Sequence, residues 1–318
     1  MDAARRGLAL SMKALVYSDF GGNDRFELTE REEPHVGPDT LVVRVVAAGI
    51  NPVDYKIREG YLRGLIDTQL PAVPGWDVAG IVEKTGLDTP EFAVGDPVLA
   101  YARADVVGHG SVAELMPVPV RAATRKPDGL SFEAAAALPL AGLTALQTLE
   151  RAAVGAGQNV LIHGAAGGVG SFGVQLARLR GARVVGTASE RNHAYLRELG
   201  AEPVVYGDGL VDAARALVPS GFDVIVDFVG GSTLDTTREL LAPGGVVASI
   251  ADSRARTEFG GHYIWVRPDA AQLGELAQLA AAGDLRVEIA STYPLDEAAA
   301  AYAELEEGHT RGKIVVTV

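Results

Sequence analysis

The strongest constraint on the fold is a stretch near the middle of the chain, NVLIHGAAGGVGSFGVQLARLRGARVVGT at residues 159–187. An apolar strand runs into a loop of glycine and alanine and a helix follows, which favours a phosphate site over a glycine-rich turn that binds nothing. The loop fits the dinucleotide fingerprint with alanine in place of its first glycine. Gly167 would let the backbone approach a pyrophosphate, Gly170 would let the helix pack on the strand, and the helix N-terminus would offer its N–H groups to the phosphates. The predicted phosphate-binding residues are Ala165, Gly167, Gly168, Val169 and Gly170.

The end of the next strand, 183–187, indicates which dinucleotide binds. NAD enzymes usually carry an acidic residue there to hold the ribose hydroxyls. Here Ser189 follows the strand and Arg191 comes two residues later. A hydroxyl and a guanidinium suit a 2′-phosphate, so we predict NADPH over NADH, with the intervening Glu190 facing solvent. The alternative for Arg191 is a solvated cation at the start of a helix.

The rhythm of the chain changes near Leu130. Before it, short apolar segments separated by Gly and Pro predict a β-rich unit, with strands at 13–17, 40–48, 78–84 and 97–101. After it, a helix at 131–138 opens an alternation of strands and helices, which is typical of a parallel sheet covered on both faces. The predicted strands of this sheet are 159–163, 183–187, 204–206, 223–229, 246–251 and 263–266. A helix at 268–282 and a last strand at 313–318 follow, and the last strand is expected to return to the first unit.

Composition excludes several classes of protein. The net charge of −13 repels phosphate backbones, so nucleic acid is not an expected partner. The absence of cysteine excludes disulfides and thiolate zinc sites, and the six histidines have no ligand-like spacing, so we expect no metal. No apolar run reaches the roughly 18 residues of a membrane span. Residues 1–11 are interpreted as a leader or an added extension, and the expected location is cytoplasmic.

Several separate stretches resemble one family. Besides the glycine loop they are AAGINPVDYKIREG, LPAVPGWDVAGIV, VGDPVLAY, GSVAELMPVP, AAALPLAGLTALQTL, VDFVGG and GHTRGKIVVTV. Over residues 12–318 the chain resembles the zinc-independent quinone oxidoreductase branch of the medium-chain dehydrogenase/reductase superfamily. The resemblance implies an α/β protein with a GroES-like β-rich catalytic domain at 1–129 and 268–318 and a Rossmann NADPH-binding domain, a doubly wound parallel sheet, at 130–267. It also implies an active site in the cleft between these domains.

Zinc members of this superfamily carry a catalytic Cys and a His in the first domain. This chain has Gly49-Ile50-Asn51 and Gly75-Trp76-Asp77 at the corresponding places, and the cysteine-rich lobe is absent. The resemblance therefore implies hydride transfer without metal, from NADPH to a quinone or to the activated C=C bond of an α,β-unsaturated carbonyl compound. The negative charge that develops on oxygen needs donors, and a proton must reach carbon or oxygen.

The resemblance also suggests catalytic residues. Asn51 is the first candidate for positioning the substrate, and its alternative is an Asx-turn residue that caps its own loop. Lys56 could stabilise an enolate, or it could be a solvated lysine. Tyr61 could line the cleft or donate a proton, although packing is the more common role of a tyrosine. Asp54 could orient Lys56 or Tyr55, or it could cap the following turn.

Further cofactor contacts follow from the resemblance alone. Thr144 is expected at the start of a helix near the nicotinamide, or else as a cap of that helix. Tyr206 is expected near the adenine, and Lys313 near the cofactor or as an exposed strand lysine. The ends of two further strands are expected beside the nicotinamide, and their residues are Phe228, Ser249, Ile250 and Ala251.

Three functions remain open at this stage. The first is a quinone or enone reductase. The second is a tailoring enoyl reductase or cyclisation enzyme of secondary metabolism that uses the same scaffold on a bulky substrate. The third is a non-catalytic NADPH-binding structural or sensor protein, since a fold does not determine a function. The resemblance also implies a homodimer that forms through strand edges near residues 263–266.

Overall fold

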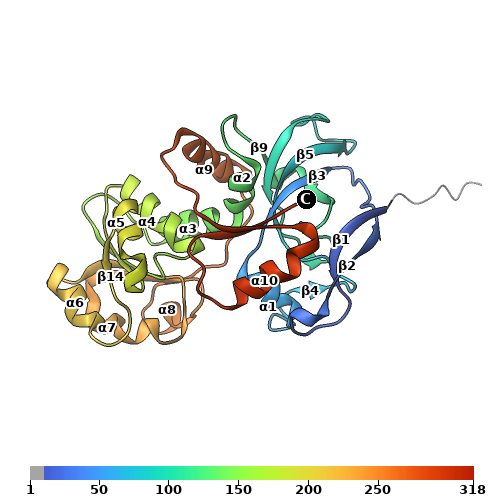
Figure 1. The fold of residues 1–318 in the computed structure, drawn as a ribbon. Helices are drawn as coiled ribbons and strands as arrows, with labels where there is room; N and C mark the ends of the chain where they lie inside the picture. Colours follow the sequence, from blue (N-terminus) through green and yellow to red (C-terminus); the bar gives the residue numbers. More distant parts are fainter. Residues whose placement is uncertain (1–10) are drawn as a thin grey trace, which may run out of the picture. The chain divides into compact units, whose positions relative to one another are not determined.

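A computed structural model describes residues 11–318 (Figure 1). The described chain divides into two compact units. Unit 1 comprises residues 11–140, 268–281 and 289–318, and unit 2 comprises residues 141–267 and 282–288. The interpretation of residues 1–10 as a leader lies outside the described residues, whereas Ser11, which was included in it, begins strand β1 (Ser11–Tyr17).

Unit 1 is built on a seven-stranded sheet around β3 (Thr40–Gly49). The path of the sheet is β16-β17-β3-β5-β6-β9, and β8 also pairs with β3. The other strands of this sheet are β5 (Asp77–Thr85), β6 (Pro97–Tyr101), β8 (Leu115–Pro119), β9 (Ala123–Arg125), β16 (Ile289–Pro294) and β17 (Lys313–Thr317). β1 forms a hairpin with β2 (Phe26–Glu32), and β4 (Asp67–Thr68) pairs with β7 (Val106–Val107). As expected, the last strand of the chain joins the β-rich unit, where β17 pairs with β3.

The helices of unit 1 include one that the change of rhythm assigned to the second domain. They are α1 (Pro52–Arg58), α2 (Phe132–Ala137), α9 (Ala270–Ala282) and α10 (Ala298–Glu306). Helix α2 begins where predicted, with Ser131 as its N-cap, but its buried alanines pack on β3 and β5 of unit 1. The approach is so close that a Cβ at Gly49 would lie 2.2 Å from the carbonyl oxygen of Ala136. The boundary between the units falls later, between Leu140 and Ala141 inside α3 (Pro139–Arg151).

Unit 2 is a six-stranded parallel sheet with helices between the strands (Figure 1). Its strand order is β12 (Glu202–Val204), β11 (Arg183–Thr187), β10 (Asn159–His163), β13 (Phe222–Asp227), β14 (Leu241–Ser249) and β15 (His262–Tyr263). The first strand of this sheet along the chain, β10, lies in the middle. The next two strands, β11 and β12, are added on one side of it, and β13, β14 and β15 are then added on the other side. This is the doubly wound order, and it places a ligand crevice at the carboxyl ends of β10 and β13. The predicted α/β fold is thereby confirmed.

The remaining helices connect these strands. They are α3, α4 (Gly168–Leu179), α5 (His193–Leu199), α6 (Leu210–Leu217), α7 (Thr237–Leu240) and α8 (Arg254–Thr257). Short 3₁₀ helices also occur, namely η1 (Asn23–Arg25), η2 (Val120–Ala122), η3 (Glu190–Asn192), η4 (Gly231–Thr236) and η5 (Leu295–Glu297). Helix α5 is followed by Gly200, a left-handed C-cap with a φ of 90°. None of the described helices has both the length and the apolar character that a membrane crossing requires.

Several predicted boundaries were wrong. The strand predicted at 204–206 lies at Glu202–Val204 instead, and it accommodates Pro203 because β12 is the edge strand of its sheet. The strand predicted at 223–229 ends at Asp227, the one predicted at 246–251 ends at Ser249, and the one predicted at 263–266 is the two-residue β15. Helix α3 begins at Pro139, so Thr144 lies in its interior and not at its start.

Candidate functional site

The glycine loop of unit 2 is shaped by close contacts at two of its glycines, Gly164 and Gly170. A Cβ at Gly170 would lie 2.1 Å from the carbonyl oxygen of Gly164, so only glycine fits there. Gly164 itself has a φ of 71°, which supplies the left-handed turn after β10. Its N–H donates to the Thr187 hydroxyl at 3.1 Å, and the N–H of Ala165 donates to the Thr187 carbonyl at 3.1 Å. The alanine in the fingerprint is therefore accommodated because the positive φ falls one residue earlier.

The loop presents three of its five predicted residues to solvent. Gly167, Gly168 and Val169 are partly exposed, whereas Ala165 and Gly170 are buried. Gly167 is the N-cap of α4, and the first turn of a helix leaves N–H groups without partners inside the helix. These N–H groups and the positive end of the helix dipole fit a phosphate. The two buried residues shape the loop instead.

The candidate 2′-phosphate residues lie beyond β11. Ser189 directly precedes η3, and its hydroxyl accepts a long hydrogen bond of 3.4 Å from the side chain of Asn192. Arg191 and Glu190 are both exposed, so the backbone leaves each of them accessible. Tyr206 follows the neighbouring strand β12 and is 58% exposed. The fold thus brings Ser189, Arg191 and Tyr206 to the carboxyl ends of two adjacent parallel strands.

A buried carboxylate organises the next two loops of this edge. Oδ1 of Asp227 accepts hydrogen bonds of 2.9 Å from the N–H groups of Val229 and Gly230 and from the Thr233 hydroxyl. Oδ2 accepts one of 2.6 Å from the Ser249 hydroxyl. Because these bonds turn the chain directly after β13, they explain the early end of that strand. Sequence reasoning missed Asp227, although a carboxylate that closes the apolar run DVIVD was a usable signal.

Ser249 has no hydrogen-bonding capacity left for a ligand. Its side chain is fully buried, and besides donating to Asp227 its hydroxyl accepts from the N–H groups of Ala251 (3.0 Å) and Asp252 (2.9 Å). The N–H of Ile250 donates to the Asp227 carbonyl at 3.2 Å. The side chain of Ser249 therefore shapes the loop of Ile250 and Ala251. Any contact of this segment with a cofactor stays a prediction.

Two other predicted cofactor residues lie in packed surroundings. Thr144 is buried within α3, and its carbonyl accepts from the Thr148 hydroxyl at 2.7 Å. The ring of Phe228 lies against α4, where a Cβ at Gly173 would come within 2.9 Å of it. Their cofactor contacts stay predictions.

Unit 1 contains a buried polar cluster formed by Asn51, Asp77 and Lys313. Nδ2 of Asn51 donates to Oδ2 of Asp77 at 2.9 Å, and the Lys313 ammonium donates to Oδ1 of Asn51 and, at 2.9 Å, to the carbonyl of Ile50. Oδ1 of Asp77 accepts from the N–H of Leu140 at 2.9 Å. All three side chains are at most 5% exposed. Asn51 and Lys313, which the sequence treated separately, are thus direct partners, and Asp77 is a member that sequence reasoning did not propose.

Asp54 extends this cluster. Its Oδ2 accepts from the N–H of Asn51 at 2.8 Å and from the hydroxyl of Tyr302 at 3.2 Å, so it caps its own turn. The pKa of Asp54 is raised to about 7, mainly by burial and also by the nearby Asp77, against the opposing effects of the hydrogen bond from Asn51, the charge of Lys313 and the hydrogen bond from Tyr302. Burial also raises the pKa of Asp77 to about 6 against the opposing effects of Lys313, Asn51 and Leu140. The pKa of Lys313 is lowered by burial.

Lys56 and Tyr61 stand apart from this cluster. Lys56 lies on the exposed face of α1, and Tyr61 follows that helix with 75% of its surface exposed. Their catalytic roles stay predictions that this cluster does not support.

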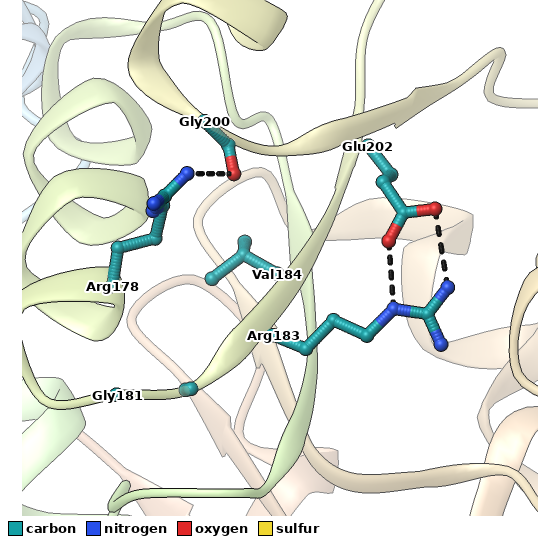
Figure 2. Close-up of a pocket in the computed structure, with 7 residues that line it drawn as sticks. Arg178, Gly181, Arg183, Val184, Gly200 and Glu202 are labelled. Atoms are coloured by element: carbon teal, nitrogen blue, oxygen red, sulfur yellow. Dashed lines mark hydrogen bonds and ion pairs between the residues drawn. The ribbon is translucent and has the colours of Figure 1, made fainter.

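A surface pocket of 360 Å³ lies elsewhere in unit 2, and Figure 2 shows its lining. The Arg178 guanidinium donates to the carbonyl of Gly200 at 2.9 Å, and Arg183 binds both carboxylate oxygens of Glu202 at 2.7 and 3.1 Å. Arg183 and Glu202 are the first residues of β11 and β12. The pocket is therefore at the amino ends of the strands, opposite the edge where ligands of such sheets bind.

Comparison with known proteins is consistent with this organisation. Residues 37–128 match the alcohol dehydrogenase GroES-like domain family, and residues 199–316 match the zinc-binding dehydrogenase family. The chain is 35% identical to the chloroplastic NADPH-dependent alkenal/one oxidoreductase of Arabidopsis thaliana, over 96% of this chain and 79% of that protein. The chain belongs to the medium-chain dehydrogenase/reductase superfamily.

Solved structures of this superfamily superpose on the chain over nearly its whole length. The quinone oxidoreductase from Coxiella burnetii is 34% identical with a TM-score of 0.88, covering 97% of this chain and 100% of that one. A mycobacterial protein complexed with NADPH is 28% identical with a TM-score of 0.84, again covering 97% and 100%. The GroES-like and Rossmann parts of the fold that the resemblance implied are thereby confirmed.

The side chains of this superfamily member do not suit the zinc that one matching family is named for. Protein zinc ligands are thiolates, imidazoles and carboxylates. At the corresponding places this chain offers the Asn51 amide and the Asp77 carboxylate, which bind each other, and the Lys313 ammonium donates to the Asn51 amide. Within residues 11–318 no three His, Cys, Asp or Glu side chains gather as a metal site would require. We therefore derive no step through zinc.

Proposed function

We propose that the chain is an NADPH-dependent oxidoreductase that reduces a quinone or the activated C=C bond of an α,β-unsaturated carbonyl compound. The observation that carries the proposal is the loop of Gly164 to Gly170, which turns too tightly for a Cβ at Gly170 and leaves Gly167, Gly168 and Val169 partly exposed at the N-terminus of α4, where N–H groups fit a pyrophosphate. Similarity over nearly the whole chain to an alkenal/one oxidoreductase and a quinone oxidoreductase supports the choice of reaction.

Different residues of this chain bind the cofactor and stabilise the charge that develops on the substrate. Gly167, Gly168 and Val169 hold the pyrophosphate at the start of α4, and Ser189 with Arg191 hold the 2′-phosphate. When bound, NADPH supplies the hydride. The carbonyl oxygen of the substrate then gains negative charge, and a donor such as an Asn51 Nδ2 hydrogen stabilises it before a proton completes the reduction.

The first experiment follows the absorbance of NADPH as the purified chain meets quinones, enones and enals, with NADH in parallel. We expect turnover on at least one of these classes, with NADPH preferred. Tight NADPH binding without turnover across the panel would overturn the general reductase and favour a tailoring enzyme for a bulky substrate or a non-catalytic NADPH-binding protein. Absence of NADPH binding would overturn the cofactor assignment as well.

We also propose a homodimer and a cytoplasmic location. β15 is the last strand on its side of the six-stranded sheet, and Tyr263 within it and Trp265 just after it are 39% and 40% exposed, which supports an edge-to-edge contact. Light scattering should give twice the 33.1 kDa mass of the chain, and a monomer would contradict the dimer. Fractionation of the source cells tests the location.

A further inference from the structure

The side-chain amide of Asn51 is held at both of its ends by groups of opposite charge. An ammonium can only donate hydrogen bonds, and an ionised carboxylate can only accept them. Lys313 therefore requires the amide oxygen on its side, and Asp77 requires the amide nitrogen on the other. Rotating the amide by half a turn would place N–H groups against the ammonium and oxygen against the carboxylate. One orientation of Asn51 is thus strongly selected.

Lys313 and Asp77 are themselves fixed by the backbone. Lys313 also donates to the carbonyl of Ile50 at 2.9 Å, and Asp77 also accepts from the N–H of Leu140 at 2.9 Å. Both residues begin strands, β17 and β5, that pair with β3, which ends two residues before Asn51. The amide of Asn51 is consequently held between the first residues of two strands that are each paired with β3.

This arrangement uses one Nδ2 hydrogen of Asn51 and leaves the other weakly bound. The hydrogen bond from Nδ2 to Oδ2 of Asp77 is 2.9 Å long, whereas the contact of Nδ2 with the carbonyl of Gly49 is 3.5 Å long. A contact of that length is at the limit of a hydrogen bond. This second hydrogen has the weaker partner, so the proposed hydrogen bond from Asn51 to a substrate oxygen would use it.

The side chain of Lys313 is buried, and two of the three N–H donors of its ammonium are used inside the protein, by the carbonyl of Ile50 and Oδ1 of Asn51. Loss of its charge would leave Asp77 buried without its strongest opposing charge, because the other ionisable groups around Asp77 are Asp54 and Tyr101. The main effect of Lys313 is therefore on Asn51 and Asp77.

We propose that Lys313 and Asp77 are positioning residues for the reduction. They fix the orientation in which Asn51 donates its hydrogen bond, and they do not contact the cofactor. This inference rests on the proposed function. The resemblance to relatives instead suggested that Lys313 touches the cofactor. The two roles predict different kinetic and binding results.

The test compares Lys313→Met, Asp77→Asn and the double variant with the wild type. The rate at which the wild type oxidises NADPH with an enone as substrate is measured first. We expect each single variant to lower kcat roughly 10- to 100-fold, because a misplaced donor loses its contribution to the transition state. The NADPH Kd should stay within about twofold. The double variant should lose less than the product of the single losses, because it leaves no buried charge without its partner. Lys84→Met, which removes a surface lysine–carboxylate pair in the same unit, is the matched control.

Two further readouts separate positioning from a general structural role. The acidic limb of the kcat profile should move to higher pH in Lys313→Met, because Lys313 lowers the pKa of Asp77. The side-chain NH₂ signals of Asn51, assigned by their loss in Asn51→Asp, should exchange with solvent faster in Lys313→Met.

A Lys313→Met protein with unchanged kcat, or with an NADPH Kd raised tenfold at preserved kcat, would overturn the proposal. A wild type without turnover would contradict the proposed function instead, and the exchange of the Asn51 signals would still decide whether Lys313 fixes the amide of Asn51. If Lys313→Met fails to fold, Asp77→Asn carries the same kinetic comparison.

Discussion

Each unit contains a buried carboxylate at a strand end, and the two are satisfied in different ways. Asp227 of unit 2 accepts hydrogen bonds from neutral donors that lie two to 22 residues away along the chain. Asp77 of unit 1 contacts the amide of Asn51, 26 residues away, in a cluster whose cation, Lys313, is 262 residues from Asn51. In unit 2 the carboxylate is held by backbone N–H groups and hydroxyls of the two adjoining loops, whereas in unit 1 the cluster joins an amide to charged side chains that only the folded sheet brings together.

This difference indicates which kind of change should impair each unit. A site made of backbone geometry should fail when a side chain is added or a loop anchor is lost, with little dependence on pH. A buried cluster of two carboxylates and one ammonium should respond to the protonation state of Asp54 and Asp77. The predictions below test this contrast, starting with the largest expected effect.

Gly170→Ala should abolish the cofactor site of unit 2. The added Cβ would lie 2.1 Å from the Gly164 carbonyl oxygen and 2.7 Å from the Ala165 Cα, and neither backbone atom can yield without opening the loop. We expect NADPH binding about 100-fold weaker, as overpacking of about 3 kcal/mol implies. Gly155→Ala, in the same unit with nothing within 4 Å of its added Cβ, should bind like the wild type. Isothermal titration measures both, and equal affinities for the two variants would show that the loop is not backbone-limited.

Asp227→Asn should loosen the two loops that follow β13 and β14. The amide keeps one acceptor oxygen, so some of the four hydrogen bonds to Asp227 must be lost. A buried donor without a partner costs about 2 kcal/mol, and we expect a roughly 30-fold loss of NADPH affinity. Asp212→Asn on the surface of α6 is the control. An affinity that is unchanged in Asp227→Asn would mean that these loops do not shape the cofactor site.

How much could be predicted from the sequence follows from the same contrast. The glycine loop was readable because its steric requirements fall on consecutive residues. The parallel sheet could be predicted because its central strands β10, β11 and β13 contain short apolar runs. The predicted end of β13 was wrong because hydrogen bonds to Asp227 turn the chain there. The predicted end of β12 was wrong because Val205 and Tyr206 have high strand propensity but lie exposed beyond the strand.

The cluster of unit 1 could not be derived from spacing. Asn51 and Lys313 were named through resemblance, but no local pattern shows that residues 262 positions apart touch. Asp77 follows a tryptophan at the start of an apolar strand, which reads as an ordinary strand residue. Only the antiparallel pairing of β3 with both β5 and β17 places the three side chains together.

The double variant Ser189→Ala with Arg191→Ala should change the cofactor preference of unit 2 without damaging its fold. Ser189 is partly exposed and Arg191 exposed, so their loss leaves the loop intact. We expect NADPH to bind roughly 10-fold more weakly, as the loss of a charge-assisted contact implies, while NADH binding changes less than about threefold. Parallel titrations with both cofactors measure the ratio. Equal losses for the two would remove the argument for a 2′-phosphate site at this strand end.

Asp54→Asn should flatten the dependence of stability on pH, which is the smallest effect and the one specific to unit 1. The pKa of Asp54 is raised to about 7 in the folded chain, so between its ordinary pKa and 7 the folded state binds more protons than the unfolded state. Stability therefore falls as pH rises through this window, by about 1 kcal/mol between pH 6 and pH 8. Urea unfolding at both values should show this fall in the wild type and in the surface control Asp88→Asn but not in Asp54→Asn. If Asp54→Asn retains the full fall, another group is responsible, and the contrast between a titrating cluster in unit 1 and a backbone-built edge in unit 2 loses its main support.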